Sequence, residues 1–245
     1  MQGDVKSKPI LFNTAMVQAI LDGRKTMTRR VVKPQPNHHY DDDCTKPGYF
    51  NSGGNEWACK QCGGEIAPFT GKSKMKAPYQ VGDVLWVRET WRVEEARQIA
   101  RICIIEYKAG GETKLIEEII ALPTTEGRWR PSIHMPREAA RIFLKVSDVR
   151  VERLRDITEE QALKEGIVAW TKDGWRKKYA PADSEGDGPN CKWADCPREY
   201  KKAMEKLWDS TIKKKDLDQF GWDANPFVWA VEFERLPINE VVKNA

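Results

Sequence analysis

Alternation of apolar and polar residues predicts several β-strands in this chain. In the segment VGDVLWVRETW, Leu85 and Val87 alternate with Trp86 and Arg88. A period of two places successive side chains on opposite faces of a strand. A second apolar stretch, residues 140–154, is long enough to bend or to pair with two neighbours. The predicted strands cover residues 81–91, 100–109, 140–154 and 225–236.

Three other segments carry the signals of helices. Asn13 is a good N-cap for a short amphipathic helix, and Gly23 ends it. Thr158 and Gln161 have the spacing of a capping box, in a helix that Gly166 closes. The predicted helices cover residues 13–22, 156–166 and 198–212, the last with one apolar stripe.

Two polar stretches interrupt this pattern, at residues 34–80 and 169–197. Both are rich in turn-forming residues, so we expect irregular insertions. Helices do not alternate regularly with strands, and no glycine-rich phosphate loop occurs, which disfavours a parallel α/β sheet. The predicted fold class is α+β, mainly β, with a small barrel-like β core, flanking helices and two irregular insertions.

Composition excludes two broad classes of protein. Of the 245 residues, 40% are hydrophobic and 32% are charged, which fits neither a disordered chain nor a membrane protein. No apolar run approaches the roughly 18 residues of a membrane-spanning helix. The first ten residues lack the apolar core of a signal peptide. We therefore expect a cytoplasmic protein with no membrane partner.

Positive charge is concentrated in two parts of the chain. The net charge of +4 permits a polyanionic partner but does not by itself indicate one. Residues 23–33, which include GRKTMTRR, carry five basic residues and no acidic one, and residues 128–155 carry eight basic residues. If these segments fold together, they form a positive face suited to nucleic acid. The alternative is scattered surface charge that keeps the protein soluble.

Five motifs follow one another along the chain: GRKTMTRR, VGDVLWVRETW, WRPSIHMPREAARI, LRDITEEQALKEGI and WDANPFVWAVEFERL. In this order they resemble the ASCH domain family, most closely its longer phage- and prophage-associated members. The resemblance covers about residues 11–35, 80–168 and 220–236, and the two insertions fall outside it. It implies a single ASCH domain over residues 8–236, on a PUA-like β-barrel of a kind associated with RNA binding.

The resemblance also implies a reaction. Some small ASCH proteins are amidohydrolases that remove the acetyl group from N4-acetylcytidine, using a lysine, a threonine and a glutamate. At the matching positions this chain has Lys25, Thr28 and Glu165. Those amidohydrolases are much shorter than this chain and lack both insertions.

Other family members are reported as ribonucleases, and most have no assigned function. The expected ligand is RNA or a modified nucleoside, bound in a basic cleft, and no organic cofactor is expected. Three functions therefore stay open: hydrolysis of an N4-acylcytidine-type amide, a non-catalytic RNA-binding or phage accessory module, and a ribonuclease.

The residue types suit amide hydrolysis, which needs a nucleophile, a proton acceptor and a proton donor. Thr28 supplies a hydroxyl, and Lys25 can take its proton if burial or neighbouring positive charge lowers the lysine pKa. Glu165 can shuttle protons, because it lies at the negative end of a helix dipole, which disfavours its charged form. In a regular strand Lys25 and Thr28 point to opposite faces, so they converge only if Lys25 lies in a turn after Gly23. Otherwise, Lys25 and Arg30 contact phosphate, and Thr28 only fills a strand position.

Aromatic and charged side chains in the motifs are candidates for contacts with an unpaired base. Trp86 or Trp129 offers a surface on which a base can stack. Glu89 either pairs with an arginine or holds a substrate amine. His134 contacts the ligand, acts as an acid or base, or only satisfies its hydrogen bonds in a loop. The predicted binding residues are Arg29, Arg30, Trp86, Arg88, Glu89, Trp129, Arg130 and His134.

The chain has six cysteines, which in a cytoplasmic protein argues against structural disulfides. Cys59 and Cys62 have the two-residue gap of a zinc knuckle. Cys191 and Cys196 would complete a structural zinc site that ties the two insertions together. The alternatives are free thiols, or ligands from Cys44 with His38 or His39.

Overall fold

The fold is known from a computed structural model of the chain. It describes residues 7–37, 49–51, 57–59, 67–68, 77–97, 102–117, 126–171, 174, 176–181 and 192–237. These residues form a mixed α and β structure in which strands predominate. Within these ranges, no helix combines the length and the apolar character needed to cross a membrane.

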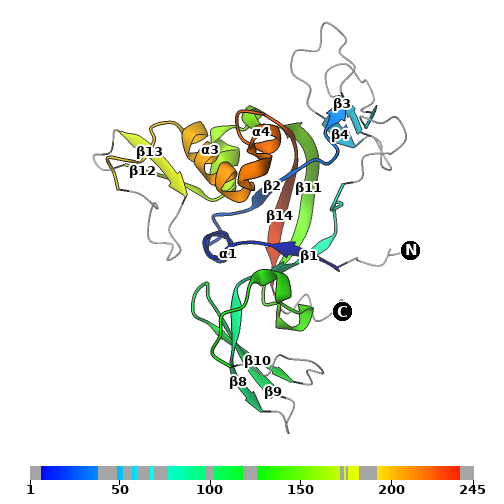
Figure 1. The fold of residues 1–245 in the computed structure, drawn as a ribbon, viewed down its shortest axis with the longest axis vertical. Coiled ribbons are helices and arrows are strands. Elements are labelled where there is room, and N and C mark those ends of the chain that lie inside the picture. The colour runs from blue at the N-terminus through cyan, green and yellow to red at the C-terminus, as the bar shows by residue number, and fades with distance from the viewer. Residues whose placement is uncertain are drawn as a thin grey trace, which may run out of the picture.

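A central sheet holds the strands that position the candidate site (Figure 1). β1 runs parallel to β7, and the other neighbours along the path are antiparallel. A short pair, β4 (Tyr49–Asn51) and β5 (Trp57–Cys59), joins the sheet through β11. The strand order is β1 (Ser7–Leu11), β7 (Val84–Arg88), β11 (Phe143–Arg153), β14 (Phe227–Leu236) and β2 (Met27–Val31).

The long central strand β11 pairs with β7 near its start and with β14 along most of its length. A bulge between Val146 and Asp148 interrupts the pairing with β14, just past the end of the pairing with β7. The prediction of a long strand that serves two partners is confirmed.

No backbone pairing joins the edge strands β1 and β2 within the described residues, so the sheet does not close into a hydrogen-bonded barrel there. A side chain connects these two edges instead. Arg30 on β2 donates from Nη2 to the carbonyl oxygen of Leu11 on β1, at 2.9 Å.

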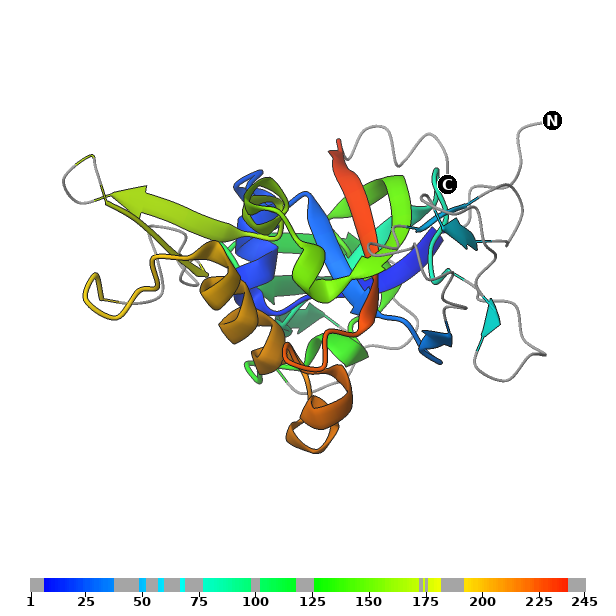
Figure 2. The ribbon, with the colours of Figure 1, turned by 90° about the horizontal axis from the view of Figure 1, so that it is seen from above.

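Three smaller sheets surround the central one. The β8–β9–β10 sheet extends below it in Figure 1, and the β12–β13 hairpin lies beside α3 in both Figure 1 and Figure 2. The bounds are β8 (Trp91–Arg97), β9 (Ile102–Tyr107), β10 (Thr113–Glu117), β12 (Ile167–Thr171), β13 (Lys177–Pro181), β3 (Pro36–Asn37) and β6 (Ala67–Pro68).

Two predictions need correction. The predicted strand at 81–91 is two strands in different sheets, because Leu85 and Val87 enter the main core whereas Trp91 enters the core under β8–β10. The predicted irregular insertion at 169–197 contains most of the β12–β13 hairpin. Tyr179 is buried there against α3 residues such as Trp208, and this apolar contact explains the order. Most of the 34–80 insertion lies outside the described residues.

The predicted helices form with their expected caps. Asn13 accepts the backbone N–H of Met16 at the start of α1 (Thr14–Leu21). Thr158 and Gln161 form the capping box of α2 (Glu159–Lys164). Besides these, the structure contains α3 (Tyr200–Thr211), α4 (Leu217–Phe220) and the 3-10 turns η1 (Ser132–His134), η2 (Arg137–Ala139), η3 (Leu154–Asp156) and η4 (Lys214–Asp216).

Strand β14 is buried on both faces and so connects two cores. Trp229 and Val231 pack into the main core with Ile20 of α1. Val228, which points the other way, packs with Met204 of α3. The predicted alternation in residues 225–236 is thus correct for one face, while α3 covers the other.

Candidate functional site

Lys25 lies in the connection between α1 and β2. Gly23 adopts a φ of +74°, a conformation that favours glycine, and the helix ends there. The backbone N–H of Lys25 donates to the Ala19 carbonyl at 2.9 Å, and β2 begins only at Met27. The condition that Lys25 should precede the strand, in a turn, is therefore met.

The Lys25 side chain is fully buried, with 1% of the residue exposed. Its Nζ donates to the Met27 carbonyl at 2.8 Å, to the Glu165 carbonyl at 2.9 Å and to Glu165 Oε2 at 2.7 Å. An ammonium group has three N–H donors, so all of them have an acceptor. Lysine is almost never fully buried without such partners, which singles this residue out.

Glu165 is held at the C-terminal end of α2, where it forms the C-cap. Gly166 follows with a φ of +99°. A Cβ atom at Gly166 would lie 3.4 Å from the Ala19 Cβ and 3.7 Å from the Lys25 Cβ. Glycine therefore allows α1, α2 and the Lys25 segment to approach closely enough for the ion pair.

Arg29 occupies the second oxygen of Glu165. Its Nη1 lies 3.1 Å from Glu165 Oε1, and its Nη2 donates to Gln161 Oε1 at 3.0 Å and pairs with Glu152. Two cations, Lys25 and Arg29, thus meet two carboxylates in a cluster that is almost closed to solvent. Charges buried in this way are tolerated only when they are paired and hydrogen-bonded.

Burial lowers the pKa of Lys25 and is the largest effect on it. The carboxylate of Glu165 opposes this effect, because it stabilises the charged amine. Arg30 and Arg29 add to the lowering through their positive charge. Both causes named from the sequence are thus present, and burial is the larger.

Thr28 is buried and pairs with Val231 of β14. Because it is one residue from Arg29, it faces the opposite side of β2, the side that Arg30 also faces. Among the described residues, its hydroxyl has no hydrogen bond to Lys25 or to Glu165. The structure therefore brings Lys25 and Glu165 together and leaves Thr28, three residues after Lys25, without a direct bond to either.

The ring of Phe12 lies close to both Lys25 and Arg30. The Lys25 Nζ lies 5.7 Å from the centre of its ring, and the Arg30 guanidinium carbon lies 5.3 Å from it. Arg30 is half-buried, and its bond to the Leu11 carbonyl uses one of its five N–H donors.

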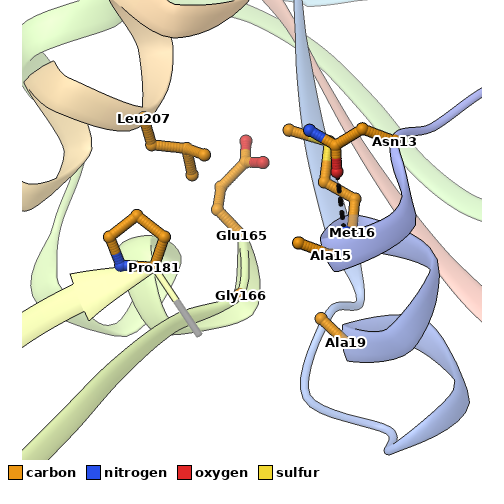
Figure 3. A pocket seen from close by; sticks show the side chains of 8 residues that line it. All are labelled: Asn13, Ala15, Met16, Ala19, Glu165, Gly166, Pro181 and Leu207. Carbon is orange, nitrogen blue, oxygen red and sulfur yellow. Dashed lines mark hydrogen bonds between the residues drawn. The ribbon is translucent and has the colours of Figure 1, made fainter. Parts of the chain in front are cut away.

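A pocket opens beside Glu165, between α1, α3 and the end of β13 (Figure 3). Ala15, Met16 and Ala19 of α1 form one wall, and Pro181 and Leu207 form another. The space measures about 300 Å³, including the part that is continuous with solvent. Glu165, the partner of Lys25, thus borders a largely apolar hollow.

Other predicted binding residues lie around β7, β8 and η1. Arg88 donates from Nε to the Met135 carbonyl at 3.1 Å and also bonds the Ile133 carbonyl, and its guanidinium lies 5.3 Å from the Trp86 ring. His134 is exposed on η1.

Arginine side chains also lie over the rings of Trp129 and Trp91. Arg92 lies 4.6 Å from the Trp129 ring, and Arg130 lies 5.7 Å from the Trp91 ring. Stacking of a base on Trp86 or Trp129 therefore requires the arginine to share or leave the ring face.

Glu89 pairs with an arginine, which is the first of its two predicted roles. Arg141 donates from Nε and Nη2 to the two Glu89 oxygens at 2.9 and 2.8 Å. Glu112 and the Ala109 carbonyl take further donors of Arg141.

Sequence reasoning did not identify Arg141, nor Glu152 and Gln161 beside Arg29. Their partners are far away in the sequence, so no local spacing signals the contacts.

The predicted zinc ligands fall largely outside the described residues. Cys62, Cys191, Cys44, His38 and His39 are not described, and Cys59 is described only as the end of β5. Cys196 is buried and disulfide-bonded, which corrects the expectation that the chain has no structural disulfide, and its sulfur can bind zinc only after reduction. Within the described ranges, no group of three or more histidine, cysteine, aspartate or glutamate residues has the arrangement of a metal site. The zinc site stays a prediction.

Comparisons of this chain with models of known protein families, with curated proteins and with solved structures found no match.

Proposed function

We propose that this chain is an ASCH-type domain that binds a modified nucleoside, free or within RNA, and hydrolyses an N4-acylcytidine-type amide. The observation that carries the proposal is the fully buried Lys25, paired with a carboxylate that borders a pocket. Buried ionisable groups with a shifted pKa beside a hollow are characteristic of active sites. The five motifs, read in order, supply the substrate class.

The fold expected of such a domain is a PUA-like barrel. In support, a side chain of the edge strand β2 bonds the backbone of the other edge strand, β1, through Arg30 and Leu11. Closure of a barrel brings these two edges together. The proposal therefore treats the central sheet as a barrel that side chains complete at this seam.

The proposed reaction begins with proton transfer from Lys25 Nζ to Glu165 Oε2, which leaves a neutral amine and a neutral acid. The Thr28 hydroxyl attacks the amide carbon, and Nζ takes its proton. The C–N bond then breaks, and Glu165 gives its proton to the leaving N4 amine. Water hydrolyses the Thr28 ester in the same way, with Nζ taking a water proton and Glu165 returning one to the Thr28 oxygen.

Electrostatics around Thr28 suit this sequence of steps. Arg30 faces the same side of β2 as Thr28, so its positive charge can stabilise the oxyanion that forms during the attack. Arg29 holds the second oxygen of Glu165 and so fixes which oxygen faces Lys25. Since the paired charges are nearly closed to solvent, proton transfer between them needs little rearrangement of water.

A second candidate is RNA binding without chemistry. It is favoured by the three acceptors that already occupy the Lys25 ammonium, and by the absence of a bond from Thr28 to Lys25. In this case the cluster only joins α2 to β2, and guanidinium-covered rings such as Trp129 contact the RNA.

The test is release of acetate and cytidine from N4-acetylcytidine by the wild type, Thr28→Val and Glu165→Gln, with Thr26→Ala as a matched threonine control. We expect release by the wild type and the control, and a large loss in the other two, because each lacks a reacting group. Thr28→Val keeps the size and branching that suit a strand position. Equal release by Thr28→Val and the wild type would remove Thr28 from the mechanism, and no release by the wild type would favour binding alone.

A further inference from the structure

We propose that the pocket beside Glu165 receives the acyl chain of the substrate, and that Ala15 and Leu207 on its opposite walls set the chain length accepted. This inference rests on the proposed amide hydrolysis, and it names the part of the substrate that enters the molecule. The residues face each other across the hollow from α1 and α3 (Figure 3).

The chemistry of the lining favours an acyl chain over a base. The edge of a cytosine needs hydrogen-bond partners, and burying it without them is costly. The pocket has few to offer. Asn13 Oδ1 already accepts the N–H of Met16 at 2.8 Å, and both oxygens of Glu165 already accept from Lys25 and Arg29. The rest of the lining is small or apolar, which suits a hydrocarbon chain.

The position of Glu165 indicates which part of the substrate enters the pocket. Its carboxylate belongs both to the reacting pair and to the pocket lining. An amide whose carbonyl carbon lies next to this pair can place one of its two substituents in the hollow. The apolar substituent is the acyl chain, so the polar nucleoside stays outside.

The hollow is small and opens to solvent on one side. Its cavity volume is about 30 Å³, and the surrounding free space of about 300 Å³ includes open solvent, so methylenes beyond acetyl extend toward the opening. Pro181 and Leu207 limit the space, and both lie after the start of the second predicted insertion. One of the two walls that determine length therefore comes from the part of the chain outside the matched motifs.

The experiment compares kcat/KM for N4-acetyl-, N4-propionyl- and N4-butyrylcytidine. In the wild type we expect a rise of at most about fourfold for each added methylene, because only the part of the chain inside the hollow is transferred fully out of water. Ala15→Leu fills the hollow from α1 and should lower the butyryl-to-acetyl ratio by about tenfold or more. Leu207→Ala opens the other wall and should raise that ratio. Leucine and alanine have similar helix propensities, so neither change strains its helix.

Leu217→Ala is the control, since Leu217 is also half-buried but does not line the pocket. Its ratio should equal that of the wild type, and thermal unfolding confirms that each variant is folded. If the wild type turns over the substrates and every variant ranks them in the same order by kcat/KM, the pocket assignment is wrong while the proposed hydrolysis stands.

Calorimetric binding of the same three compounds separates the pocket from the chemistry. Tighter binding of butyrylcytidine than of acetylcytidine, reversed by Ala15→Leu, would support the pocket even if nothing is hydrolysed. Equal binding of the three compounds, together with no hydrolysis, would overturn both the pocket and the proposed function.

Discussion

Replacing Lys25 by methionine removes the buried charge and keeps most of the side-chain volume. The change deletes three hydrogen bonds from Nζ, two of them to backbone carbonyls and one to Glu165. Removing one partner of a buried ion pair costs roughly 3–5 kcal/mol when the other charge is left without compensation. Here Arg29 still holds Glu165 at 3.1 Å. We therefore expect a smaller loss, about 1–3 kcal/mol, which is the range for buried acceptors left without a donor.

A double-mutant cycle measures the interaction within the pair. The free energy of unfolding by urea is determined for the wild type, Lys25→Met, Glu165→Leu and the double variant. Glu165→Leu leaves Arg29 with Glu152 and Gln161, so this variant also keeps a compensated cluster. For residues in contact we expect a coupling energy of about 1–3 kcal/mol. Effects that add to within about 0.5 kcal/mol would refute the ion pair as a coupled unit.

Three further predictions test other parts of the structure. Because burial lowers the pKa of Lys25 from 10.5, unfolding takes up a proton between the lowered pKa and 10.5. The wild type should thus gain stability relative to Lys25→Met as pH rises through this range, by at most about 1.4 kcal/mol per pH unit, and a loss would mean a raised pKa. Binding of single-stranded RNA should weaken with salt, and Arg30→Ala should flatten the slope of log K against log salt by roughly 0.7, whereas an unchanged slope would show that Arg30 contacts no phosphate. Elemental analysis of reduced protein should find one zinc per chain, and less than about a tenth of an equivalent would rule out the structural site. The zinc ligands predicted are Cys59, Cys62, Cys191 and Cys196.

Local signals in the sequence predicted the ends of two helices. Asn13, Gly23 and the Thr158–Gln161 box determine where α1 and α2 begin or end, since each acts on backbone groups within one turn. The start of β2 after Lys25 was a condition for the convergence of Lys25 and Thr28 and was not itself predicted. Contacts between distant segments were less accessible. Arg141 bonds Glu89 across 52 residues, and no spacing in the chain encodes that bond.

The candidate site shows the same division. The resemblance to the ASCH family led to Lys25 and Glu165, which lie 140 residues apart and are in contact. The role of Arg29 was expected to be ligand binding, but it is buried and bonds Glu165. Alternation in residues 81–91 predicted one strand because a polar–apolar period does not reveal a change of sheet. The chain passes from one sheet to the other between Arg88 and Trp91, because Val87 and Trp91 are buried in two different cores.

The central claim is that Lys25 takes the proton of the nucleophile. The most direct measurement is the rate of cytidine release from N4-acetylcytidine by the wild type and by Lys25→Met. The rates are measured without denaturant, at a pH where circular dichroism shows both proteins to be folded. Lys145→Met, at an exposed lysine of β11, is the control. We expect a loss of roughly 10²–10⁴-fold in kcat for Lys25→Met, the usual contribution of a positioned general base, and no change for the control. Equal rates for folded Lys25→Met and wild type would contradict it.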